Sequence, residues 1–204
     1  PGADYLQLAF TMSKGGLSRG TSKTMVEGLG YGGIIRQNGK LTPITLGDKV
    51  MEIDFGSIKT KALCIPWGDV STAWRSTGIA NIEVYSGVPD KTIAAARISR
   101  WFNWIFRQRW LKDYLLKKID QRPAGPDLEK IAQGRSYLWG KVWDEEGHAV
   151  EARLETISGY MLTAKTAVII AEKILNDTVR PGYFTTAQYF GEDLILSVEG
   201  SRFF

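Results

Sequence analysis

The sequence predicts an α+β fold: a mostly antiparallel, mixed sheet with helices packed on it. Three observations lead to this prediction. Asn38-Gly39 separates two strand-like runs, and Asn-Gly is the strongest short signal for a β-hairpin. Two more pairs of strand-like runs are close neighbours in the chain, 51–55 with 59–65 and 137–143 with 150–156. Helical segments fall between these hairpins without regular strand–helix alternation, so repeated β-α-β units are not expected.

The first half of the chain contains clear strand and turn signals. Residues 4–12 alternate apolar and polar side chains, which is typical of a half-buried strand. A short helix over 21–29 is expected next, with Ser18 or Thr21 as its N-cap, and the glycines of 28–33 end it. The other elements expected here are the hairpin 34–36 with 40–44, the strand pair 51–55 with 59–65, a helix over 70–74 capped by Asp69, and a strand over 81–86.

The second half is richer in helix. Residues 92–119 are expected to be helical, and 121–126 (QRPAGP) is a breaker and the best candidate for an internal linker. The other elements expected here are a short helix over 127–133, the hairpin 137–143 with 150–156, an apolar helix over 160–175 capped by Ser158, and a last strand over 194–198.

The composition is that of a folded globular protein. The 204 residues are 44% hydrophobic and 24% charged, enough for one domain with its own core or for a tight pair of small ones. No uncharged apolar run approaches the ~18 residues that a membrane span needs. The chain begins with Pro-Gly-Ala and not with Met. We therefore expect it to be a fragment of a longer protein.

Cysteine and histidine are each present once. Cys64 alone excludes an internal disulfide, and nothing resembles a secretion signal, so a cytoplasmic location is expected. His148 is the single histidine. A tetrahedral zinc site built from His and Cys needs three or four such ligands, so no metal is expected.

The positive charge is concentrated in one segment. The net charge is +4, and residues 91–122 hold nine basic side chains against Asp113 and Asp120. Aromatic and aliphatic residues interleave with them: Trp101, Phe102, Trp104, Ile105, Phe106, Trp110, Leu111, Tyr114 and Leu115. This pattern fits a helix over 92–119 that lies on an anionic lipid surface or binds a partner. It also fits a helix packed on its own domain. No standard nucleic-acid-binding motif is present, so no nucleic acid is expected.

Two short stretches match known motifs, but the elements expected around them are not those that the motifs require. Residues 28–33 (GLGYGG) satisfy G-x-G-x-x-G, but a helix precedes them and a hairpin follows, the reverse of a dinucleotide-binding turn. Residues 16–20 (GLSRG) satisfy G-x-S-x-G, with Ser18 as nucleophile and His148 as base. Only seventeen residues precede Ser18, too few for the strands that normally come before this motif. A serine hydrolase is therefore the less favoured alternative.

Several stretches, taken in order, resemble one family. They are 16–21 (GLSRGT), 27–30 (EGLG), 52–56 (EIDFG), 65–73 (IPWGDVSTA), 76–79 (STGI), 81–85 (NIEVY), 123–126 (PAGP), 152–156 (ARLET), 159–160 (GY) and 162–164 (LTA). The chain resembles the C-terminal part of the saccharopine dehydrogenase-like oxidoreductases, a group that includes trans-acting enoyl reductases. The resemblance runs across nearly the whole chain.

The resemblance implies an architecture and a cofactor. Such proteins have an N-terminal Rossmann domain that binds NAD(P), followed by a domain whose sheet resembles that of the C-terminal domain of glyceraldehyde-phosphate dehydrogenase. Residues 1–204 would then be the substrate-binding and dimerisation domain, with a helical insertion at about 91–134. The Rossmann domain would lie upstream, and this chain alone would bind no cofactor. A homodimer formed through the sheet is also implied.

The chemistry implied is hydride transfer, with the cofactor supplying the reactive atom. Asp69 is the candidate catalytic residue, since it lies with Trp67 in a probable loop after a strand; its alternative role is a helix cap. The other candidate substrate-binding residues are Arg19 and Arg75 as clamps for a carboxylate or phosphate, and Thr77 and Tyr160 as hydroxyl donors. The alternatives are surface ion pairs for the arginines, a turn for Thr77 and the core for Tyr160. The substrate would be a small molecule or an acyl chain, and an acyl chain would give the aromatic segment 92–119 a purpose.

Overall fold

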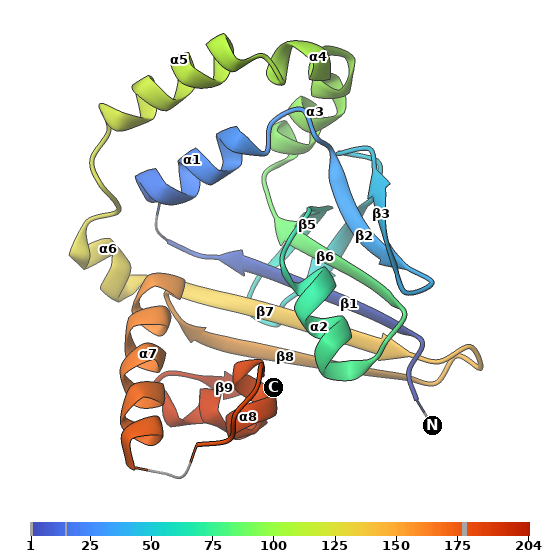
Figure 1. Ribbon diagram of the computed structural model, residues 1–204, viewed down its shortest axis with the longest axis vertical. Coiled ribbons are helices and arrows are strands. Elements are labelled where there is room, and N and C mark those ends of the chain that lie inside the picture. Colours follow the sequence, from blue (N-terminus) through green and yellow to red (C-terminus); the bar gives the residue numbers. More distant parts are fainter. Residues whose placement is uncertain (1, 15, 177–178) are drawn as a thin grey trace.

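The computed structural model describes residues 2–14, 16–176 and 179–204. Nine strands in these ranges form one sheet, which runs through the molecule (Figure 1). They are β1 (Tyr5–Met12), β2 (Gly33–Gln37), β3 (Lys40–Ile44), β4 (Val50–Asp54), β5 (Lys59–Cys64), β6 (Asn81–Gly87), β7 (Arg135–Trp143), β8 (Ala149–Ile157) and β9 (Arg202–Phe203). Their main order is β3-β2-β6-β1-β7-β8-β9, and β5 joins β4 to β6.

The sheet is mixed but mostly antiparallel, as predicted. In the described ranges, β1 and β6 are its parallel pair, with Leu8 opposite Val84, and all the other pairs are antiparallel. The helices are α1 (Arg19–Glu27), α2 (Asp69–Thr77), α3 (Asp90–Ser99), α4 (Asn103–Phe106), α5 (Arg109–Asp120), α6 (Leu128–Gln133), α7 (Gly159–Asn176) and α8 (Thr186–Phe190), with 3-10 turns η1 (Arg100–Phe102) and η2 (Glu192–Ser197). The α+β class is therefore confirmed.

The two faces of the sheet have different covers, because successive side chains of a strand point to opposite faces. On one face Leu6 and Ile82 pack with Ile79 beneath α2. On the other face the β4–β5 hairpin covers the main core. That core consists of Ala9, Ile35, Ile53, Phe55, Ala62, Cys64, Tyr85, Tyr137 and Trp139.

Local signals in the sequence explain several element ends. The Ser18 side chain accepts a hydrogen bond from the Thr21 N–H, so it is the N-cap of α1. Asn38 and Gly39 have φ of 49° and 75°, the left-handed values that a two-residue hairpin turn requires. Asp127 caps α6 in the same way as Ser18 caps α1. The predictions of the Ser18 cap and of the hairpin turn at Asn38 and Gly39 are confirmed, whereas the cap at Asp127 was not predicted.

Two predicted caps are wrong. The N-cap of α2 is Gly68, and Asp69 is the first residue of the helix with no capping hydrogen bond from its side chain. At the start of α7 the Ser158 backbone oxygen accepts from the Leu162 N–H. The Ser158 hydroxyl is buried and has no hydrogen-bond partner in the part of the chain that the structure describes. Ser158 therefore occupies the N-cap position of α7 without a capping bond from its hydroxyl, whereas Asp69 lies one residue beyond the N-cap of α2.

The prediction of one continuous helix over 92–119 is wrong. The segment forms α3, η1, α4 and α5 in succession, and extended backbone at Gln108 (φ −68°, ψ 131°) separates α4 from α5. Apolar side chains are too widely spread around this segment for one straight helix to bury them. Residues 194–198 fall mainly in the 3-10 turn η2, and the last strand is β9 instead. Helix α8 has no counterpart among the predicted elements.

Helix α7 is apolar and poorly covered. Its sequence, GYMLTAKTAVIIAEKILN, contains only three charged residues, yet none of its residues is buried against the rest of the described chain. None of the helices in the described ranges has both the length and the apolar character that crossing a membrane requires.

Candidate functional site

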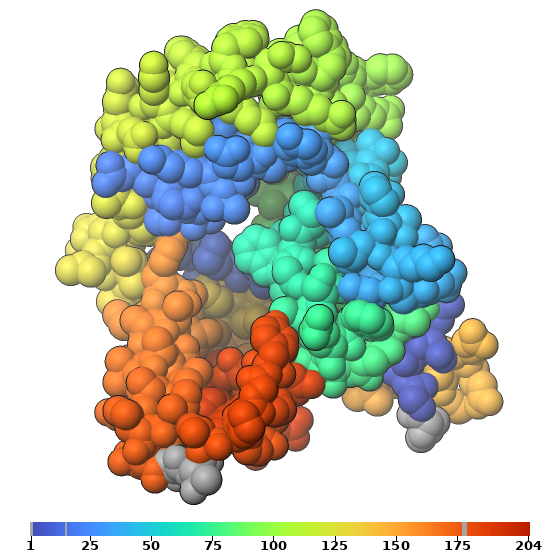
Figure 2. Space-filling model, in the orientation of Figure 1, coloured from blue at the N-terminus to red at the C-terminus, as the bar shows by residue number. Residues whose placement is uncertain are grey.

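A hollow on the α2 side of the sheet is the candidate site. Figure 2 shows the molecule hollowed between α1, α2, α7 and the C-terminal segment, with β1 and β7 at the bottom. The pocket on this side has a volume of about 280 Å³. Its lining consists of Leu8, Ala9, Phe10, Asp69, Val84, Leu138, Trp139, Gly140, Ala152, Arg153, Leu154 and Phe203. The floor is therefore apolar, and Asp69 brings a carboxylate to it.

Asp69 reaches the hollow because α2 is held on the sheet by a buried arginine. The Arg36 side chain donates from Nε to the backbone oxygen of Val70 at 2.7 Å and from a terminal nitrogen to that of Gly39 at 2.6 Å. Its guanidinium also lies 4.2 Å from the centre of the Trp74 ring. These contacts fix the first turn of α2 and with it the position of Asp69.

Burial raises the pKa of the Asp69 carboxyl, and a hydrogen bond from its own backbone N–H offsets part of that effect. A carboxyl group with a raised pKa is closer to the range in which it can both hold and release a proton near neutral pH. Of the residues that the sequence proposed for the site, Asp69 is the one that lines this pocket.

Trp67 lies near the same hollow. Its ring packs on that of Phe10 with centroids 5.0 Å apart, and Phe10 is a floor residue. The indole itself is about half exposed, so it can form part of a rim. Sequence reasoning placed Trp67 in a loop and missed Phe10. The alternation along β1 could have assigned Phe10 to the same face as Leu8.

Arg75 and Thr77 lie at the other end of α2. The Arg75 guanidinium stands 5.5 Å from the ring centre of Tyr183, and its backbone oxygen accepts from Gln188. The Thr77 hydroxyl donates to the Ala73 backbone oxygen at 2.7 Å and accepts from the Ile79 N–H. Neither residue lines the pocket. The Arg75 contacts dock α8 and the segment before it, and the Thr77 contacts lie at the end of α2.

Arg19 and Tyr160 each form contacts near the start of α1. The Arg19 guanidinium donates to the Asp120 backbone oxygen at 3.2 Å, and the Arg19 backbone N–H donates to the Ala124 backbone oxygen. The Tyr160 hydroxyl lies 2.7 Å from the Ser18 backbone nitrogen. Burial alone would raise the pKa of Tyr160, but hydrogen bonds from Ser18 and Thr21 outweigh it, so the pKa lies below its ordinary value. Both residues tie elements together, and neither lines the pocket.

The structure contradicts the serine-hydrolase alternative. The Ser18 hydroxyl is engaged with Thr21 as the cap of α1. His148 lies in the β7–β8 turn, while Ser18 lies near α7, which follows the opposite end of this hairpin. The length of β7 separates those ends by about 25 Å. The imidazole therefore cannot act as a base for Ser18.

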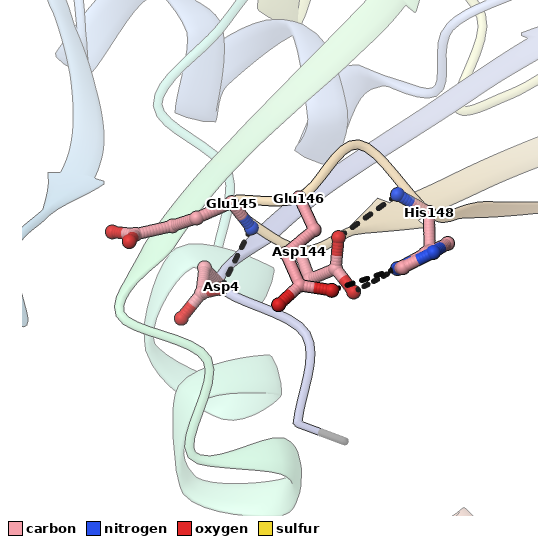
Figure 3. A network of polar contacts seen from close by, with 5 residues as sticks. All are labelled: Asp4, Asp144, Glu145, Glu146 and His148. Atoms are coloured by element: carbon pink, nitrogen blue, oxygen red, sulfur yellow. Dashed lines mark hydrogen bonds and ion pairs between the residues drawn. The ribbon is translucent and has the colours of Figure 1, made fainter.

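The β7–β8 turn holds a group of possible metal ligands (Figure 3). His148 Nδ1 lies 2.9 Å from Asp144 Oδ2 and 3.6 Å from Glu146 Oε2, and one donor atom of each lies within 4.8 Å of the others. The hydrogen bond with His148 lowers the pKa of Asp144. Sequence reasoning expected no metal and overlooked this set, which the spacing 144-146-148 could have indicated. Glu146 and His148 are exposed, so these contacts are those of an ordinary surface turn.

No family model matches the sequence, and no curated protein matches it. Among solved structures, the chain is similar to apo histidine-tagged saccharopine dehydrogenase (L-Glu forming) from Saccharomyces cerevisiae. The TM-score is 0.50 and the sequence identity 9%, and the match covers 96% of this chain and 64% of the yeast chain. At this identity the match concerns the fold. The chain therefore has a saccharopine dehydrogenase-like fold.

Proposed function

We propose that this chain is the substrate-binding and dimerisation domain of an NAD(P)-dependent oxidoreductase. In this proposal a Rossmann domain that precedes it in the full-length protein binds the nucleotide. The observation that carries the proposal is the Asp69 carboxyl at an open, apolar hollow. A carboxyl group over an apolar floor fits one part of an active site, and in this proposal a second domain supplies the remaining groups.

The chain's own glycine-rich motif does not fit the nucleotide. Residues 28–33 follow helix α1 and lead into strand β2, and Gly30 and Gly32 have φ of 85° and 78°. A pyrophosphate site needs a strand before the motif and a helix N-terminus after it. This supports a separate nucleotide-binding domain. The cofactor would exchange a hydride with the substrate, and the residues of this chain would position the substrate and move a proton at Asp69.

The lining of the hollow favours an apolar substrate group. Arg153 lines the pocket, but its guanidinium bonds Glu151 and the Asp54 backbone oxygen on the other side of the sheet. Arg19 and Arg75 are engaged elsewhere, as described above. A substrate with an acyl chain would bury that chain against Leu8, Leu138 and Leu154. We propose an acyl-chain substrate for this reason.

Helix α7 supports the presence of a further domain. It borders the hollow (Figure 2), none of its residues is fully buried, and Val168, Ile174 and Leu175 are exposed. A domain that closed over the hollow would also cover α7 and remove this apolar surface from water. Dimerisation through the sheet remains part of the proposal, and sedimentation of the chain would measure it.

Substitution of Asp69 tests the catalytic assignment. The full-length protein would be assayed for loss of NADPH absorbance with medium-chain 2-enoyl thioesters as probe substrates. Asp69→Asn is expected to lower kcat by about 100-fold or more and to leave the Kd for NADPH unchanged. Asp90→Asn is the matched control, because Asp90 is also the first residue of a helix but is exposed and pairs with Lys61. Equal activity of the two variants would contradict the assignment.

A further inference from the structure

The segment 90–120 forms the outermost layer of the molecule. It comprises α3, η1, α4 and α5, and we call it the arm. Figures 1 and 2 show the arm beyond α1, on the far side of that helix from the hollow. Its chemistry is therefore separate from that of Asp69.

Inward contacts hold the arm in a fixed place. Lys112 Nζ donates to the Glu27 backbone oxygen at 2.6 Å, Arg107 Nε to that of Gly30 at 2.8 Å, and Arg97 Nε to that of Gly47 at 3.1 Å. Ile93, Ala96 and Ile119 of the arm are buried. The arm is thus docked on its own domain through its basic side chains and a few apolar residues. This agrees with the predicted alternative of a helix packed on its own domain.

This docking leaves the largest apolar side chains of the arm in water. Trp101, Trp104 and Trp110 are 71%, 66% and 65% exposed. All seven tryptophans lie in the described ranges, and these three are the most exposed; Trp67 and Trp74 follow at 47% and 40%. Packing within the chain therefore covers one side of the arm and leaves the side that carries the three indole rings exposed to water.

Cations lie next to these exposed rings. The Arg100 guanidinium is 5.2 Å from the Trp101 ring centre, and Lys118 Nζ is 4.7 Å from that of Tyr114. Lys91, Lys117 and Lys118 form no ion pair within the ranges that the structure describes. Exposed indole rings on a segment that also carries unpaired lysines match the headgroup region of a membrane, where the rings enter the interface and the cations meet phosphate.

We infer that the arm docks this protein on an anionic lipid surface through Trp101, Trp104 and Trp110, with Lys117 and Lys118 facing the headgroups. The argument for lipid over a protein partner is the charge pattern, because basic side chains are interleaved with exposed aromatic rings along the arm. The rings enter only the interface, and the helices lie along it without crossing it.

Flotation of the chain with vesicles tests the inference. Vesicles of phosphatidylcholine alone are compared with vesicles that also contain phosphatidylserine, at low and high salt. Binding is expected only with phosphatidylserine and is expected to fall as salt rises. The triple variant Trp101→Ser, Trp104→Ser, Trp110→Ser should lose about tenfold or more in binding. The double variant Lys117→Gln, Lys118→Gln should bind the anionic vesicles about fivefold more weakly for each charge removed.

Matched controls come from exposed residues outside the arm. The apolar control removes three exposed apolar side chains in the triple variant Leu128→Ser, Val150→Ser, Leu175→Ser. The charge control removes two charges from α7 in the double variant Lys165→Gln, Lys173→Gln. Both controls should bind like the wild type. Quenching of the wild-type tryptophan fluorescence by brominated lipid gives a second test that needs no variant, and shallow quenching is expected.

Three results would overturn the inference. One is equal binding to neutral and anionic vesicles. Another is binding by the triple tryptophan variant at the wild-type level, or absence of quenching by brominated lipid. The third is a change from dimer to monomer in the triple variant without lipid, which would assign the arm to contact between copies of the chain.

Discussion

The phenolic oxygen of Tyr160 lies 2.7 Å from the backbone nitrogen of Ser18 and accepts its hydrogen bond. The two residues are 142 positions apart in the chain, and the bond joins the first turn of α7 to the start of α1. The Ser18 hydroxyl meanwhile caps α1. The Tyr160 hydroxyl also lies 3.4 Å from the Thr21 hydroxyl, so one side chain of α7 fixes this helix to the start of α1.

Removal of the Tyr160 hydroxyl tests this tie. Tyr160→Phe leaves the half-buried Ser18 N–H without its acceptor, and the expected loss is about 1–2 kcal/mol in the free energy of unfolding. For a chain of this size that corresponds to a fall in Tm of about 2–8 °C. Tyr114→Phe is the control, because this exposed ring keeps its contact with Lys118. Equal Tm values for the two variants would refute the structural role of Tyr160.

Ser158 should behave unlike a helix cap. Its buried hydroxyl has no partner in the described chain, so Ser158→Ala is expected to leave the free energy of unfolding unchanged or to raise it. A true cap would lose about 1 kcal/mol on the same change, as we expect for Ser18→Ala. Urea unfolding of the two variants measures the difference. A loss at Ser158 as large as that at Ser18 would contradict this geometry.

Arg36 should control the order of α2. Arg36→Met removes the donors to Val70 and Gly39 and is expected to cost about 2–3 kcal/mol. Arg36→Lys should recover only part of this, since an ammonium group cannot bond both oxygens and cover the Trp74 ring. Hydrogen exchange of the α2 amides is the measurement, and faster exchange confined to α2 is expected. Unchanged exchange in Arg36→Met would show that α2 does not depend on this side chain.

Glu83 should link stability to acid pH. Burial raises its pKa, but hydrogen bonds from Lys49, Tyr85 and Gln7 outweigh this effect, and the pKa lies below the ordinary value of 4.5. Because the folded state favours the ionised form, the stabilisation is complete above pH 4.5 and is lost as the pH falls through the folded pKa.

The measurement compares the wild type with Glu83→Gln in urea at neutral and acid pH. The variant is expected to be about 1–3 kcal/mol less stable at pH 7, with the gap closing below pH 4.5. Glu172→Gln, an exposed change on α7, should show no gap at either pH. A gap that stayed constant with pH would show that Glu83 acts only through packing.

Much of the fold could be predicted because its signals are local. The turn at Asn38 and Gly39, the cap at Ser18 and the alternation along β1 all depend on near neighbours. The breaks inside 92–119 could not be predicted in this way. They depend on how the segment docks on the end of α1 through Lys112 and on the turn after α1 through Arg107, and both partners are backbone atoms distant in the sequence.

The candidate site was predictable only in part. Asp69 was identified from its place after a strand, although its expected role as a cap was wrong. Arg19, Arg75 and Tyr160 were predicted from the chemistry of their side chains. In the structure each of these side chains contacts another part of the same chain and does not line the pocket. Arg36 and Phe10 were missed because burial under α2 and the register of β1 decide their roles.

NADPH titration is the most direct test of the central claim, that this chain supplies the substrate half of an oxidoreductase. Nucleotide fluorescence would be followed on addition to this chain and to the full-length protein. We predict saturable binding by the full-length protein, with a Kd in the range of about 1 μM to 1 mM, and none by this chain. Saturable binding by this chain, or absence of binding by the full-length protein, would contradict the account.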